Sequence, residues 1–86
     1  MRRIYKYTLD LQETTRLASC IVRPLSIQVQ NDKICLWAEI DPDVKSQPIV
    51  LTIVGTGRTM SQSIGTYIST IQKDSYVWHF YWRYDI

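Results

Sequence analysis

The chain contains few of the residues that mark metal sites, disulfide frameworks or catalytic centres. It has one histidine and two cysteines, Cys20 and Cys35. Three such residues cannot complete a four-ligand zinc site without carboxylates, and no CxxC pair occurs. A disulfide would require an oxidising environment, which nothing else in the sequence indicates. We therefore expect two free thiols, no metal and no cofactor.

Long apolar runs and a strong charge excess are also missing. No apolar run approaches the roughly 18 residues of a membrane span, and residues 1–11 lack the apolar core of a signal peptide. Ten Lys and Arg against eight Asp and Glu give a formal net charge of +2. The basic residues are scattered along the chain, which argues against a dedicated nucleic-acid binder. These features predict a protein of the cytoplasm that makes no membrane contact.

What the chain does contain is apolar and aromatic side chains. Of its 86 residues, 45% are hydrophobic and 12% are aromatic, including three Trp and six Tyr. This is enough apolar material for a packed core and too much for a disordered chain. The length allows one domain, residues 1–86, and no second core.

The clearest pattern runs from Leu25 to Asp41, where two alternating stretches meet at Asn31-Asp32. A two-residue hairpin turn at Asn31-Asp32 fixes the register, because a slip by one residue would mix the apolar and polar faces. The predicted apolar pairs are Val29 with Ile34, Ile27 with Leu36, and Leu25 with Ala38.

The remaining segments also predict strands. Alternation or β-branched composition indicates strands within 2–11, 49–54, 65–72 and 76–84, with a short edge strand within 12–18. The continuous apolar run 49–54 is typical of a central strand covered on both faces, by the core or by a partner subunit. Pro24 has no N–H to donate, so we expect it at the entrance of its strand. No segment has helical spacing. The prediction is an all-β fold, a compact antiparallel sandwich or small barrel of six to seven short strands.

The last predicted strand has aromatic or apolar residues on both faces. Tyr76, Trp78, Phe80 and Trp82 alternate with Val77, His79 and Tyr81. An excess of aromatic surface on a small domain favours an interface. We therefore expect a homo-oligomer with Trp78, Phe80 and Trp82 as interface residues. In the alternative interpretation, a two-sheet core absorbs these side chains.

The best candidate for a ligand site is the segment Gly55-Thr56-Gly57-Arg58. Its glycines allow backbone N–H groups to line a concavity, and the Arg58 guanidinium can bind a phosphate. In the alternative interpretation, the glycines only serve a tight bend.

The predicted ligand-binding set also includes Trp37, Trp78 and His79. The two tryptophans can stack on a base. For His79, a packed or surface position without a role is the alternative. Asp41 and Asp43 could bind a cation, but Asp-Pro-Asp is also an ordinary turn.

Several blocks of the sequence resemble a family of short, functionally uncharacterised proteins of tailed phages and prophages. Their order and spacing match nearly end to end, and the differences lie at Ser69 and in the tail 81–86. The matching blocks are Ile4-Tyr5-Lys6-Tyr7, Leu25 to Asn31, Cys35-Leu36-Trp37-Ala38, Asp41-Pro42-Asp43, Gly55-Thr56-Gly57, Gly65-Thr66-Tyr67-Ile68 and Val77-Trp78-His79-Phe80. The resemblance implies a phage origin and residence in the cytoplasm of a bacterial host, and it implies no catalytic residue.

Three functional hypotheses follow, none of them enzymatic, because no nucleophile–base pair or metal cluster can be assembled from the sequence. The first is an oligomeric phage accessory protein that binds and inactivates a host factor, in particular one in antiphage defence. The second is a sponge-like protein that holds a nucleotide or another small anion at the Gly55–Arg58 segment. The third is a minor structural protein of the virion.

Overall fold

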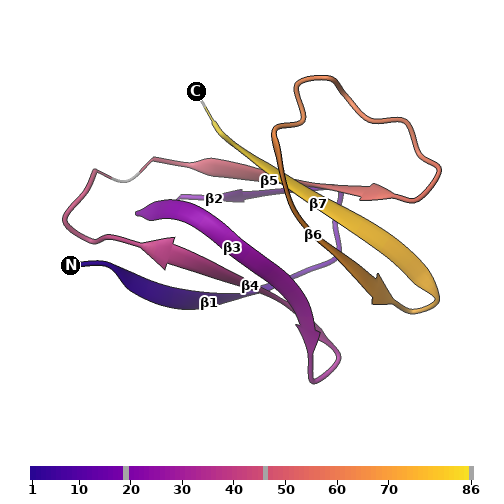
Figure 1. Ribbon diagram of the computed structural model, residues 1–86, viewed down its shortest axis with the longest axis horizontal. Helices are drawn as coiled ribbons and strands as arrows, with labels where there is room; N and C mark the ends of the chain where they lie inside the picture. The colour runs from indigo at the N-terminus through magenta and orange to yellow at the C-terminus, as the bar shows by residue number, and fades with distance from the viewer. Residues whose placement is uncertain (19, 46, 86) are drawn as a thin grey trace.

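The chain folds into two antiparallel β-sheets, as the computed structural model in Figure 1 shows. The two sheets share one apolar core. The structure describes residues 1–18, 20–45 and 47–85. One sheet has the strand order β1-β4-β3 and the other has the order β2-β5-β7-β6. The strands are β1 (Arg3–Leu9), β2 (Thr14–Leu17), β3 (Ile21–Gln30), β4 (Lys33–Ile40), β5 (Ile49–Gly55), β6 (Thr66–Lys73) and β7 (Tyr76–Tyr84). This architecture confirms the predicted all-β sandwich. In the described part of the chain, no helix is long and apolar enough to cross a membrane.

The β3–β4 hairpin has the register that the sequence predicts over most of its length. Ile27 pairs with Leu36, and Val29 pairs with Ile34. Asn31 has a φ of 51° and the following Asp32 a φ of 64°, and such a pair of positive φ values is required in a two-residue type I′ turn. The turn residues and the alternation of apolar and polar residues thus specify the same register, and the prediction is confirmed.

The predicted register is wrong at the start of the hairpin. Pro24, not Leu25, pairs with Ala38, because Leu25 is the extra residue of a β-bulge between Pro24 and Ser26. Pro24 also lies inside β3 and not at its entrance. β3 is at the edge of its sheet and Pro24 lies next to a bulge, two settings in which a strand tolerates proline. The bulge turns Leu25 outward, so that its side chain is exposed.

The strand β5 is the most completely buried element of the four-stranded sheet, where it lies between β2 and β7. Ile49, Leu51 and Ile53 belong to the core cluster between the sheets. Val50 and Val54, which alternate with them, are buried as well, although they point to the other face. The predicted central strand with cover on both faces is confirmed.

The aromatic strand β7 sends one of its faces into this core. Phe80 is 0% exposed, and Trp78 and Trp82 pack against the core cluster while keeping part of their surface exposed. Phe80 is therefore not accessible as an interface residue, because a side chain without exposed surface cannot touch a partner subunit. At the start of the same strand, Tyr76 is 64% exposed.

The two sheets are joined where the edge strands β3 and β6 meet. The backbone N–H of Ile27 in β3 donates to the Ser69 hydroxyl in β6 at 2.9 Å, next to a β-bulge between Tyr67 and Ser69. Lys73 at the end of β6 binds both Asp32 and Asp74, which lie in the turns of the two hairpins. These contacts hold β6 against the other sheet. They therefore also hold Thr66, where the chain enters β6 after the loop from β5.

Candidate functional site

The connection from β5 to β6, residues 56–65, is a loop that covers one side of the candidate site. Both strands pair antiparallel with β7, on its two sides, so the connection has to pass from one side of β7 to the other. Figure 1 shows it as the orange loop at the upper right. The loop leaves β5 after Gly55, opposite Trp78, and enters β6 at Thr66, opposite Trp82. Since Trp78 and Trp82 are four residues apart on β7, the two ends of the loop, called its feet below, are offset by about 13 Å along the strand direction.

The first foot is a tight turn from Gly55 to Arg58. The Arg58 N–H donates to the Gly55 carbonyl at 3.0 Å, and the Thr56 N–H donates to the Val77 carbonyl at 3.2 Å. Gly57 has a φ of 87°, a left-handed conformation that favours glycine. The tight bend is therefore present, and two of the backbone N–H groups are already bonded within the protein. They do not form the predicted anion-binding concavity, and the Arg58 side chain is the charged group that this turn still offers to a ligand.

Gly55 itself provides room for two neighbouring side chains. A Cβ atom at this position would lie 3.3 Å from the Trp78 ring and 3.5 Å from the Arg58 Cγ. The absence of a side chain thus allows the indole of Trp78 and the stem of Arg58 to approach each other over Gly55. The turn and the glycine together place Arg58 beside Trp78.

The second foot of the loop depends on Gly65. Its φ is 107°, and a Cβ atom there would lie 2.1 Å from the Trp82 carbonyl oxygen, so only glycine fits. The same Cβ position is 3.0 Å from the Cβ of Arg83, which places Arg83 directly beside this foot. Sequence reasoning missed both residues as parts of a site. The signal was a third glycine at the far end of the loop that begins with Gly55.

A pocket of about 750 Å³ lies between the loop and the sheet. It is lined by Leu11, Gln12, Glu13, residues 52–55, Arg58, Thr59, Met60, Ser61, Ser63, Ile64, Trp78 and Arg83. Its volume is in the range of small-molecule sites, which are commonly about 300–1,000 Å³. The lining combines apolar side chains, hydroxyl groups and two guanidinium groups.

The charges of the pocket favour an anion. Arg58 and Arg83 both line it, and neither forms an ion pair with any described residue. The Arg83 guanidinium donates to the Tyr84 carbonyl at 3.3 Å, which leaves further N–H groups for a ligand. Glu13 is the acidic residue of the lining. Two guanidinium groups against one carboxylate leave the pocket with a net positive charge.

Trp78 also carries a polar atom without a partner among the described residues. Its indole Nε1 is buried and has no hydrogen-bond partner in the described part of the protein. Buried donors are nearly always paired with protein or water. An ordered water is the usual partner of such an enclosed donor.

His79 lies outside the pocket lining, in a chain of hydroxyl groups. Its Nε2 is 2.9 Å from the Thr56 hydroxyl, and its Nδ1 is 3.0 Å from the Thr70 hydroxyl, which in turn contacts the Tyr67 hydroxyl at 2.7 Å. The ring thus links the Gly55–Arg58 turn to β6. Its Nδ1 contacts a hydroxyl and not the carboxylate that orients a catalytic histidine in a hydrolase triad.

The structure brings together only part of the predicted ligand-binding set. Gly55, Arg58 and Trp78 line the pocket, whereas Thr56 and Gly57 belong to the turn beside it. Trp37 lies in β4 of the other sheet, where it pairs with Lys6 and Ser26 and does not line the pocket.

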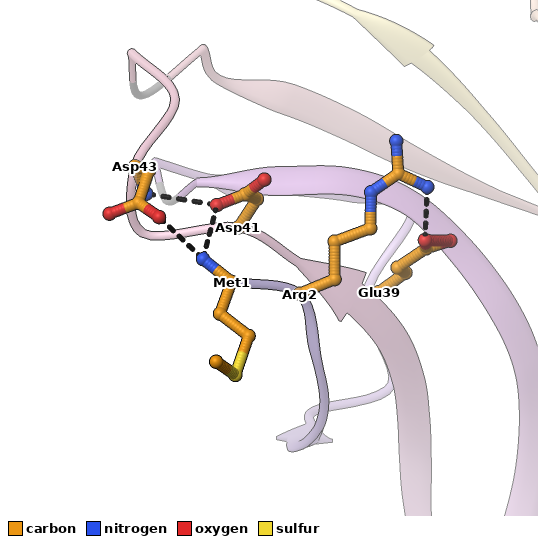
Figure 2. Close-up of polar contacts among 5 residues, drawn as sticks. All are labelled: Met1, Arg2, Glu39, Asp41 and Asp43. Atoms are coloured by element: carbon orange, nitrogen blue, oxygen red, sulfur yellow. Dashed lines mark hydrogen bonds and ion pairs between the residues drawn. The ribbon is translucent and has the colours of Figure 1, made fainter.

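The Asp-Pro-Asp segment forms a turn held by ion pairs (Figure 2). The Asp41 carboxylate accepts a hydrogen bond from the Asp43 N–H at 3.0 Å, and the Met1 amine contacts both carboxylates. The Asp43 N–H holds the pKa of Asp41 below its usual value, and the Asp43 carboxylate raises the pKa of the amine. The described residues contain no group of three or more His, Cys, Asp and Glu side chains placed to hold a metal ion.

Next to this turn, Glu39 binds two arginines. Arg2 approaches one carboxylate oxygen at 2.7 Å, as Figure 2 shows, and Arg23 approaches the other at 3.1 Å. The hydrogen bonds from Arg2 and then Arg23 lower the pKa of Glu39. The charges of this region are therefore satisfied within the protein.

Comparison with known proteins gives a family but no function. Neither the curated proteins nor the solved structures include a significant match to the chain. A family model described as a domain of unknown function, DUF7352, matches residues 1–85. The match extends over both sheets and all the residues of the pocket, and the chain therefore belongs to the DUF7352 family.

Proposed function

We propose that this protein is a non-enzymatic binding protein that captures a small organic anion in the pocket under the β5–β6 loop. The observation that carries the proposal is the pair Arg58 and Arg83, which line one pocket without an acidic partner among the described residues. A guanidinium group offers several N–H donors in a plane, which suits phosphate and carboxylate groups. The pocket volume of about 750 Å³ suits a ligand of nucleotide size.

The remaining lining supports binding and not chemistry. Ser61 and Ser63 contact each other through their hydroxyl groups at 3.1 Å, and the chain's one histidine lies outside the lining. A nucleophilic hydroxyl would need a general base within hydrogen-bond reach. The hydroxyl groups of the pocket instead suit hydrogen bonds to a bound molecule.

The resemblance to proteins of tailed phages and prophages supports a biological setting for this binding. In a bacterial host, a phage protein that sequesters a small anionic signal would block the response that the signal triggers, including a response in antiphage defence.

A second candidate function is the capture of a host protein or of another copy of the chain. The observation that favours it is a set of exposed apolar residues on β6 and β7. Tyr67, Tyr76 and Val77 are 53%, 64% and 38% exposed. Aromatic side chains of this kind are common in interfaces.

Native mass spectrometry of protein purified gently from bacterial cells tests the first candidate. The wild type should carry an added mass on the order of a few hundred daltons, as a pocket of this size predicts. The added mass should disappear in Arg58→Ala and persist in Arg3→Ala, a matched control in β1 outside the pocket. A bound host protein without small-molecule mass would favour the second candidate. A mass retained by Arg58→Ala would contradict the proposed site.

A further inference from the structure

We infer that the pocket recognises an elongated ligand with an anionic group at each end, one for each arginine. The inference rests on the proposed function and deepens it, because it specifies the charge pattern of the molecule. It follows from the positions of Arg58 and Arg83 at opposite feet of the same loop.

The first arginine belongs to the foot at Gly55. The Arg58 Cγ is 3.5 Å from the position of a Cβ on Gly55, and the N–H of Arg58 is bonded to the Gly55 carbonyl. The stem of Arg58 is thus held against the end of β5. An anionic group bound here would lie near the Trp78 indole.

The second arginine belongs to the foot at Gly65. The Arg83 Cβ is 3.0 Å from the position of a Cβ on Gly65, and Arg83 pairs with Val50 near the other end of β5. The register places Gly55 and Val50 five residues apart, or about 17 Å along the strand. The two guanidinium groups are therefore anchored toward opposite ends of the pocket, an arrangement that suits one anionic group at each end.

The part of the pocket between the two arginines is lined by apolar side chains and one carboxylate. Val54 and Ile64 are buried there, and Glu13 lies at the level of Ile53, whose N–H donates to the Glu13 carbonyl at 2.9 Å. A carboxylate in this region repels a third anionic group. The complementary ligand therefore has a neutral body between its two charged ends.

Calorimetric titration with synthetic probes tests this pattern. Octanediphosphonate, whose phosphonates are separated by roughly the spacing of the two feet, should bind at least about tenfold more tightly than octylphosphonate, because it gains a second charged hydrogen-bonded contact. Butanediphosphonate, whose phosphonates lie closer together than the two anchors, should bind more weakly than octanediphosphonate. Each protein molecule should take up one octanediphosphonate.

Substitution of either arginine should remove the advantage of the second charge. In Arg58→Gln and in Arg83→Gln, the affinity for octanediphosphonate should fall to that for octylphosphonate. The control variant Arg3→Gln loses the same charge on the other sheet and should keep the tenfold difference.

The outcomes separate this inference from the proposed function. Equal affinities for the two eight-carbon probes, or two molecules of octylphosphonate per chain, would overturn the inference while the pocket stays an anion site. If no phosphonate binds, the proposed function fails and the inference fails with it.

Discussion

Two groups of arginines in this protein have opposite surroundings. At the end of the three-stranded sheet, Arg2 and Arg23 share the Glu39 carboxylate. At the pocket, Arg58 and Arg83 have no carboxylate partner in the described chain. The first group has its charge balanced within the fold, whereas among the described residues the charges of the second are left for solvent or for a ligand. The difference separates charges that serve the structure from charges available for binding.

The backbone near the two groups differs as well. In the first group, Arg23 lies directly opposite Glu39 on the paired strands β3 and β4, and Arg2 immediately precedes β1. The pocket instead depends on a loop whose feet are set by Gly55 and Gly65. A change in a glycine should therefore disturb the pocket and leave the Glu39 network intact.

The largest effect should come from Gly65→Ala. The new Cβ would lie 2.1 Å from the Trp82 carbonyl oxygen, at a φ of 107°. The loop foot or β7 has to move, and the free energy of unfolding should fall by about 3 kcal/mol or more in a urea titration. Gly57→Ala is the matched control, because its Cβ meets open space at a similar positive φ. It should cost only about 1 kcal/mol. Equal losses in the two variants would show that contact with β7 does not fix this foot.

This contrast also explains which parts of the protein could be predicted from its sequence. The hairpin turn at Asn31-Asp32 was predictable because alternation and turn residues are local signals. The bulge at Leu25 was not predictable. The residues on either side of the extra residue still alternate between apolar and polar, so the sequence pattern does not reveal it. Arg83 gave no signal of a shared site with Arg58. The two meet at one pocket only because β5 and β6 lie on opposite sides of β7, and such pairing of distant segments is not a local property.

An intermediate effect is expected at the paired group, and it should depend on pH. The bonds from Arg2 and Arg23 lower the pKa of Glu39 in the folded protein below its ordinary value of 4.5. A carboxyl group with a lowered folded pKa stabilises the fold above its unfolded pKa, and this contribution is lost as the pH falls through the folded pKa. The melting temperature of the wild type should therefore drop more steeply below about pH 4.5 than that of Glu39→Gln. Parallel curves would mean that the two ion pairs contribute nothing to stability, as happens for many exposed pairs.

The smallest effect on stability should come from Arg58→Ala. The side chain is exposed and has no ion pair among the described residues, so its loss should change the free energy of unfolding by no more than about 0.5 kcal/mol. The same substitution should remove the binding of small anions, measured by titration with a phosphonate or by native mass spectrometry. Arg23→Ala offers the reverse case, because Arg23 binds Glu39 and does not line the pocket. It should weaken the fold at neutral pH and leave anion binding unchanged. If Arg58→Ala instead unfolds the protein, Arg58 serves the structure in the same way as Arg23, and the distinction between the two groups of arginines is lost.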